Sequence, residues 1–167
     1  MEMPAEIGKL ANEVIAALKA RGWTIATAES CTGGLIAGAL TSVSGSSDAV
    51  YGGFVTYANA AKIAMVGVPF GVLHEFGAVS KEVAAAMAEG ALTVAGTHIA
   101  VAVTGIAGPT GGSKEKPIGL VYFAVATADE TRNLKKTFDP SWSRDQIRHA
   151  SVLEALKLVK KAVAQNS

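Results

Sequence analysis

The amino-acid sequence predicts an α/β domain in which a mixed β-sheet is covered by helices in layers. Segments with apolar residues at helical spacing alternate with short apolar runs typical of strands. Residues 98–104, "HIAVAVT", are continuously apolar, as expected of a strand covered on both faces. Residues 118–127 and 132–138 are strand-like runs joined only by a polar turn, which predicts a hairpin. We expect one domain over residues 1–167, because this length is common for a single domain.

The other elements follow from periodicity and from residues that start or stop helices. Residues 5–21 carry apolar side chains at helical spacing, and Gly22 suits the end of that helix. The next elements expected are a strand at 23–28, a helix at 33–43, a turn at 44–47 and a strand at 50–57. Further helices are expected at 60–65, 69–76 and 81–95. A last helix is expected to follow Ser143 and to run to about residue 164.

Polar residues mark the starts of three of these helices. Asn59 and Ser80 are candidate N-caps for the helices that follow them. Ser143 and Gln146 form a candidate capping box for the last helix.

Composition excludes several classes of function. The 15 basic and 14 acidic residues nearly cancel, so we expect no nucleic-acid partner. No apolar stretch reaches the roughly 18 residues of a membrane span, the N-terminus lacks a signal-peptide pattern, and the chain has one cysteine. We therefore expect a cytoplasmic protein with no membrane partner. The three histidines lie at no ligand spacing to other metal-binding residues, so no metal site is expected.

Polar, glycine-rich segments follow three of the predicted strands, after residues 28, 55 and 104. In α/β sheets, binding sites gather at the carboxyl ends of strands. We therefore expect these three segments to form one site.

The first segment is "ESCTGG", which joins a strand to a helix. Ser30 is a candidate nucleophile, and nearby backbone N–H groups at the helix start could hold an anion or a developing oxyanion. Those N–H groups belong to the stretch Cys31, Thr32, Gly33 and Gly34. Alternatively, Ser30 or Thr32 only caps the helix, and Cys31 is a buried, inert thiol.

The second segment, "FVTYANAAK", carries Tyr57 and Lys62. A buried lysine whose pKa is lowered by desolvation can serve as the base for a serine nucleophile. Tyr57 could relay a proton or hold the lysine in place. The alternative is a solvated lysine and a half-buried tyrosine. A lysine base is favoured over a Ser-His-Asp arrangement because the G-x-S-x-G motif is missing.

The third segment is the loop "GIAGPTGGSKEKP", which follows Thr104. It matches neither a Walker A loop nor a Rossmann fingerprint, yet its backbone could bind phosphate or carboxylate. Its glycines are Gly105, Gly108, Gly111 and Gly112. The arginines Arg144 and Arg148 could also bind such a group, or they could form surface ion pairs with Asp145 or Glu154. An ordinary wide turn is the alternative for the loop.

Long motifs throughout the chain resemble the CinA C-terminal domain family, which includes stand-alone nicotinamide-nucleotide amidohydrolases of the PncC type. The resemblance covers about residues 5–165 and rests on "TAESCTGGLIAGALTSVSGSS", "GGFVTYANAAKIAMVGV", "GAVSKEVAAAMAEGAL" and "VAVTGIAGPTGGSKEKPIGLVYFA". It implies hydrolysis of nicotinamide mononucleotide to nicotinic acid mononucleotide and ammonia, in pyridine nucleotide recycling. It also implies a homo-oligomer and no cofactor.

Carried onto the matching positions, the resemblance implies roles for individual residues. Ser30 would attack the carboxamide, and Lys62 would take the serine proton and return it to the departing ammonia. Tyr57 would orient or relay, while Arg144 and the glycine-rich loop would hold the phosphate.

Three alternatives to this function remain. A non-catalytic nucleotide-binding module would need the loop and Arg144, but not Ser30 and Lys62 together. A competence or DNA-damage accessory protein is suggested by the family's name. A hydrolase acting on another amide is the third.

Overall fold

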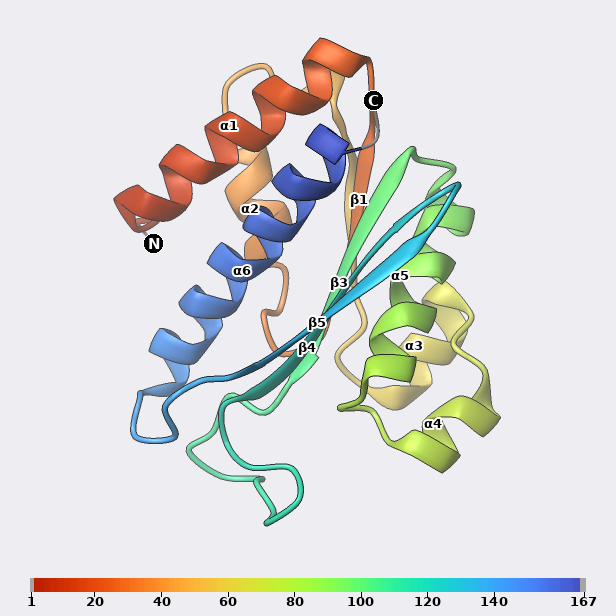
Figure 1. The fold of residues 1–167 in the computed structure, drawn as a ribbon, viewed down its shortest axis with the longest axis vertical. Coiled ribbons are helices and arrows are strands. Elements are labelled where there is room, and N and C mark those ends of the chain that lie inside the picture. Colours follow the sequence, from red (N-terminus) through yellow and green to blue (C-terminus); the bar gives the residue numbers. More distant parts are fainter. Residues whose placement is uncertain (1, 166–167) are drawn as a thin grey trace.

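The computed structural model describes residues 2–165 and shows a five-stranded sheet between two groups of helices (Figure 1). The strands lie in the order β2-β1-β3-β4-β5. Their bounds are β1 (Ile25–Glu29), β2 (Val50–Val55), β3 (Ile99–Gly105), β4 (Leu120–Thr127) and β5 (Thr131–Thr137). Strand β1 pairs parallel with β2 and β3, whereas β4 pairs antiparallel with β3 and β5. The predicted mixed sheet and its hairpin are therefore confirmed.

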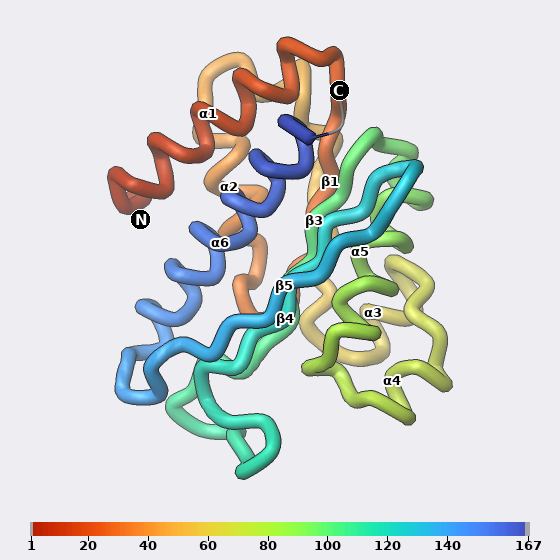
Figure 2. Tube along the Cα trace, in the orientation of Figure 1, coloured from red at the N-terminus to blue at the C-terminus, as the bar shows by residue number. Residues whose placement is uncertain are grey.

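Helices cover both faces of this sheet. They are α1 (Ala5–Arg21), α2 (Leu35–Thr41), α3 (Asn59–Val66), α4 (Phe70–Phe76), α5 (Lys81–Ala95) and α6 (Arg144–Gln165). Helices α1, α2 and α6 lie on one face, and α3, α4 and α5 lie on the other (Figures 1 and 2). The first and last helices pack side by side, so the two ends of the chain stabilise the same layer.

The central strand β3 shows why two different helical layers fit this sheet. Ile99, Val101 and Val103 belong to the core cluster shared with α1, α2 and α6. Ala100 and Ala102 alternate with them and belong to the cluster shared with α5. Side chains of a strand point alternately to opposite faces, so one face is bulky and the other is lined with alanine. All five are fully buried, which confirms that this strand is covered on both sides.

Most of the predicted helix signals are confirmed. Gly22 ends α1 in the left-handed conformation, and Ser80 Oγ accepts a hydrogen bond from Val83 N at 3.2 Å. Ser143 and Gln146 form the predicted capping box, each side chain bonding the other residue's backbone N–H.

Three local predictions are corrected. Asn59 is the first residue of α3 rather than its cap, which is Ala58. Helix α2 begins two residues later than expected, because Gly33 and Gly34 have φ of 57° and 97° and cannot continue a right-handed helix. Part of the turn expected at 44–47 is a short 3₁₀ helix, Ser46–Asp48.

Candidate active site

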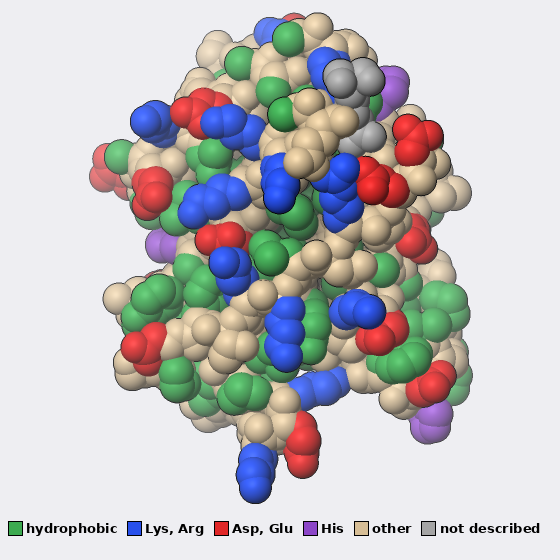
Figure 3. Space-filling view, in the orientation of Figure 1, with side chains coloured by type: hydrophobic (Ala, Val, Ile, Leu, Met, Phe, Trp, Pro, Cys, Tyr) green, Lys and Arg blue, Asp and Glu red, His purple; other side chains and the backbone are tan. Residues whose placement is uncertain are grey.

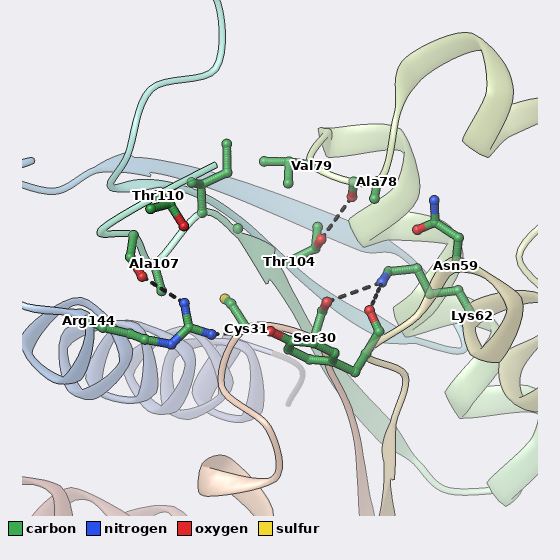
Figure 4. A pocket seen from close by; sticks show the side chains of 14 residues that line it. Ser30, Cys31, Asn59, Lys62, Ala78, Val79, Thr104, Ala107, Thr110 and Arg144 are labelled. Atoms are coloured by element: carbon green, nitrogen blue, oxygen red, sulfur yellow. Dashed lines mark hydrogen bonds between the residues drawn. The ribbon is translucent and has the colours of Figure 1, made fainter. Parts of the chain in front are cut away.

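The three predicted segments meet at one edge of the sheet, as expected from the parallel pairing of β1, β2 and β3. They line a cavity of about 260 Å³ together with the loop before α5 and the start of α6 (Figure 4). The residues that line it are Ser30, Cys31, Tyr57, Asn59, Lys62, Ala78, Val79, Thr104, Gly105, Ile106, Ala107, Gly108, Thr110 and Arg144. Of the predicted site residues, Thr32, Gly33, Gly34, Gly111 and Gly112 are not among them.

Ser30 and Lys62 form a direct contact although 32 positions separate them. Ser30 comes directly after β1, and its backbone N–H donates to Val103 O of the neighbouring strand at 3.0 Å. Lys62 lies in the first turn of α3, and its Nζ donates to Ser30 Oγ at 3.1 Å. Figure 4 shows the two side chains pointing toward each other across the cavity floor. The sequence prediction that these segments converge is confirmed.

The surroundings of Lys62 favour its uncharged form. The residue is 1 % exposed, and its Nζ also donates to Thr56 O at 2.9 Å and Tyr57 O at 3.2 Å. Within residues 2–165, no carboxylate forms an ion pair with it. Burial therefore lowers the pKa of the Lys62 amine from its ordinary value. A buried amine that loses its proton more readily, and that touches a hydroxyl, can accept the proton of that hydroxyl.

Glu29 is a buried residue of the site region that the sequence reading missed. Its side chain is fully buried and accepts four hydrogen bonds. The donors are Thr27 Oγ1 at 3.2 Å, Thr32 Oγ1 at 2.7 Å, Ile36 N at 2.8 Å and Ala37 N at 3.0 Å. An acidic residue directly after the apolar run at 23–28 was the available signal.

These bonds use part of the helix start at which backbone N–H groups were expected to hold an anion. The carboxylate of Glu29 already occupies the N–H groups of Ile36 and Ala37, so the protein's own anion sits at this helix start. The N–H of Gly33 donates to Ser30 O at 3.0 Å and is also occupied. The hydroxyl of Thr32 is used by Glu29 rather than by the cavity.

Cys31 lines the cavity but has the character of an inert thiol. It is 5 % exposed, and burial raises its pKa to about 12. The thiol therefore stays protonated at neutral pH, and a protonated thiol is a poor nucleophile.

Arg144 lies on the opposite side of the cavity from Lys62 (Figure 4). Arg144 Nη1 donates to Gly108 O at 2.7 Å, and Nη2 donates to the Tyr57 hydroxyl at 3.2 Å. The guanidinium thus joins α6, the glycine-rich loop and the segment after β2. It does not form the surface ion pair that was its alternative reading. Tyr57 contacts Lys62 through its backbone carbonyl, while its hydroxyl faces Arg144.

The glycine-rich loop contributes its first part to the cavity. Thr104 Oγ1 donates to Ala78 O at 2.8 Å, and Gly105 and Gly108 line the cavity. A Cβ at Gly112 would lie 2.8 Å from the backbone nitrogen of Ile118. That glycine is therefore needed for the close approach of two loop segments rather than for the cavity wall.

Two further features, a metal site and a membrane span, are absent from the described part of the chain. Residues 2–165 contain no group of three or more His, Cys, Asp and Glu side chains that could hold a metal ion. In the same residues, no helix combines the length and the apolar character needed to cross a bilayer.

Comparison with known proteins gives consistent matches over almost the whole chain. A family model described as the CinA C-terminal domain matches residues 7–163. A nicotinamide-nucleotide amidohydrolase PncC of Escherichia coli K12 is 46 % identical over 164 residues, which are 98 % of each chain. A CinA-like protein of Synechococcus sp. RCC307 is 49 % identical over 93 % of this chain, but the chain spans only 37 % of that protein's length.

Solved structures agree with these sequence matches. The crystal structure of the competence/damage inducible protein CihA from Agrobacterium tumefaciens superposes with a TM-score of 0.94. It is 46 % identical to this chain, and the match covers 99 % of both chains. Taken together, these matches show that the chain belongs to the CinA C-terminal domain family.

Proposed function

We propose that this protein is an amidohydrolase that converts nicotinamide mononucleotide to nicotinic acid mononucleotide and ammonia. One observation carries the proposal: Ser30 Oγ lies 3.1 Å from the Nζ of a buried lysine whose pKa is lowered. The name of the E. coli relative, 46 % identical over nearly the full length, supports the choice of substrate.

The first half of the reaction breaks the C–N bond of the carboxamide. Uncharged Lys62 accepts the hydroxyl proton while Ser30 Oγ attacks the carboxamide carbon, and the carbonyl oxygen becomes an oxyanion. When the tetrahedral intermediate collapses, the Lys62 ammonium gives that proton to the departing nitrogen. Ammonia leaves, and the nicotinoyl group remains on Ser30 as an ester.

The second half breaks that ester with water. Lys62, again uncharged, takes a proton from the water molecule as its oxygen attacks the ester carbon. The proton then returns to Ser30 Oγ as the new carboxylic acid leaves. The acid ionises in solution, because the ordinary pKa of a carboxyl lies well below neutral pH.

The opposite side of the cavity suits the phosphate of the substrate. Arg144 supplies a guanidinium whose fork geometry matches phosphate oxygens. Its present partners, Gly108 O and the Tyr57 hydroxyl, are neutral, so its charge is not cancelled by a carboxylate. The cavity thus has a reactive end at Lys62 and a cationic end at Arg144. This polarity fits a nucleotide better than free nicotinamide.

Direct binding to DNA is the weaker alternative. Figure 3 shows basic and acidic side chains intermixed over one face of the molecule, with no continuous basic stripe there. A net charge of +1 gives little long-range attraction to a phosphate backbone.

The test is ammonia release from nicotinamide mononucleotide by the wild type and by Ser30→Ala. The matched control is Ser151→Ala, which removes another buried serine, one whose Oγ bonds only Ile147 O within α6. We expect the control to keep its rate and Ser30→Ala to lose at least about 1,000-fold in kcat. Full activity in Ser30→Ala would refute the serine mechanism. A wild type that acts equally well on free nicotinamide would refute the nucleotide as substrate.

A further inference from the structure

Arg148 reaches from the second turn of α6 to the backbone directly after the candidate nucleophile. Its Nε donates to Cys31 O at 3.0 Å, and its Nη2 donates to Thr32 O at 3.4 Å. Arg148 does not line the cavity, in contrast to Arg144 one helical turn earlier. Its guanidinium therefore acts on the turn after Ser30 and not on a ligand in the cavity.

The two hydrogen bonds from Arg148 also fix the direction of neighbouring N–H groups. A peptide unit is planar and trans, so holding the oxygen of one residue also sets the direction of the next residue's N–H. The Cys31 carbonyl thus fixes the Thr32 N–H, and the Thr32 carbonyl fixes the Gly33 N–H. The latter donates to Ser30 O at 3.0 Å, so the guanidinium is coupled to the backbone of Ser30 itself.

The conformation and size of Gly33 are a second observation that links the turn to the Arg148 guanidinium. A Cβ built at Gly33 would lie 3.2 Å from Arg148 Nη2, closer than an ordinary contact. The glycine also has φ of 57°, which side-chain-bearing residues rarely adopt. Both the conformation and the missing side chain of Gly33 allow Arg148 to reach the turn.

The nucleophile is consequently held from both sides. On the side of β1, Glu29 O accepts from Thr56 N at 2.8 Å and Ser30 N donates to Val103 O. On the side of α2, Arg148 is the one side chain in residues 2–165 that donates to the carbonyls of Cys31 and Thr32. The first anchor is part of the sheet. The turn is also held locally, by Thr32 Oγ1 on Glu29 and by Leu35 N on Thr32 O, and Arg148 adds a contact from a residue that is distant in sequence.

We propose that Arg148 is a positioning residue, which acts through the Cys31–Thr32 backbone to hold Ser30 Oγ against Lys62 Nζ. This inference rests on the serine mechanism proposed above. Without the guanidinium, the turn keeps its local bonds but loses its contact with α6. A displacement of about 1 Å at a reacting atom can lower a rate by about 100-fold. Substrate affinity changes little, because Arg148 lies outside the cavity.

The test compares Arg148→Met and Arg148→Lys with the control Asp145→Asn. The control removes only the 3.8 Å ion pair between Arg148 and an exposed carboxylate, and leaves the carbonyl bonds in place. We expect kcat for ammonia release to fall about 10- to 100-fold in Arg148→Met, with KM changed less than about threefold. Arg148→Lys keeps the charge but not the fork, so it should recover only part of kcat. Asp145→Asn should match the wild type.

Hydrogen exchange in the peptide spanning residues 26–37 supplies a readout that is independent of turnover. Exchange there should accelerate in Arg148→Met and not in Asp145→Asn, while peptides from α1 and β4 stay protected as in the wild type. Unchanged kcat, a tenfold rise in KM, or a lower kcat without faster exchange in this peptide would each overturn the positioning role.

A third readout tests the positioning role of Arg148 independently of the proposed substrate. With a fluorophosphonate, Ser30 Oγ bonds to phosphorus, the P–F bond breaks and fluoride leaves, while Lys62 Nζ accepts the hydroxyl proton, so no amide substrate is needed. If the wild type does not act on nicotinamide mononucleotide, the proposed function fails, but labelling of Ser30 still reports its positioning. Slower labelling in Arg148→Met supports the inference, and equal labelling in all variants overturns it.

Discussion

Glu29 and Lys62 are both buried ionisable residues near Ser30, but their surroundings differ. Glu29 accepts four hydrogen bonds, two of them from the N–H groups at the start of α2. Within residues 2–165, the hydrogen-bond partners of Lys62 Nζ are the neutral oxygens of Ser30, Thr56 and Tyr57. Burial without a carboxylate partner lowers the pKa of the Lys62 amine, because desolvation penalises the ammonium form. The first residue therefore holds the start of α2 against β1, and the second is the base of the proposed mechanism.

The largest effect is expected from removing the reactive member of this pair. Lys62→Met should lower kcat for ammonia release by at least about 1,000-fold, because no other base in the described residues bonds Ser30 Oγ. Relief of the desolvation cost opposes the loss of the hydrogen bonds, so Tm should stay within about 4 °C of the wild type. Steady-state kinetics and calorimetry measure both quantities.

Lys160→Met is the control for that variant, since Lys160 is a half-exposed lysine paired with Glu13. Its kcat should equal that of the wild type. Retention of more than about a tenth of the activity in Lys62→Met would mean that another group is the base.

Glu29→Gln should damage the fold more than any other single change discussed. The amide has only one accepting oxygen, and its NH₂ group would face N–H or O–H donors that now bond a carboxylate. We expect the free energy of unfolding to fall by about 2–3 kcal/mol, the cost of bonds to a charged group. Urea unfolding of this variant and of the exposed control Glu75→Gln measures the difference. Equal midpoints would show that Glu29 does not organise the site.

The pH dependence of kcat should report the titration of Lys62. Lys62 must be uncharged to act as base, so activity should rise with pH by up to about tenfold per unit until the lowered pKa is passed. Because burial lowers this pKa from 10.5, the plateau should begin below pH 10.5. A profile measured between pH 6 and about pH 10 that is flat throughout would exclude Lys62 as the titrating base.

The smallest expected effect is on the cationic end of the cavity. Arg144→Ala should raise KM for nicotinamide mononucleotide by about 10- to 30-fold and lower kcat less, since the phosphate does not react. Arg132→Ala removes a partly exposed arginine of the outer strand β5 that pairs with Glu130, and it should leave both constants unchanged. A fall in kcat alone for Arg144→Ala would place that arginine in the chemical step instead.

Local patterns were enough to predict the elements and the convergence of the site. The alternation of helical and strand-like segments predicted the order of elements, and the strand ends predicted the meeting of Ser30 with Lys62. Both follow from short-range rules, because periodicity and caps are encoded within a few neighbouring residues. The same rules misplaced the start of α2, where two glycines in the left-handed conformation delay the helix.

The interpretation of single polar residues was less successful. Glu29 was missed because its importance depends on four donors from β1, α2 and the turn between them, which only folding brings together. Arg148 was grouped with Arg144 because the two lie four positions apart on one helix. In the fold, they act on different targets, since Arg144 faces the cavity and Arg148 faces the backbone of the turn after Ser30.

By itself, the sequence determined the class of fold, the edge of the sheet that carries the site and the pairing of a serine with a lysine. These depend on residue spacing along the chain, which is visible without coordinates. Only the tertiary structure decided which helix-start amides are already occupied, how deeply the lysine is buried and which arginine supports the nucleophile. Such properties depend on contacts between residues as far as 117 positions apart, and burial and partners exist only once the chain is packed.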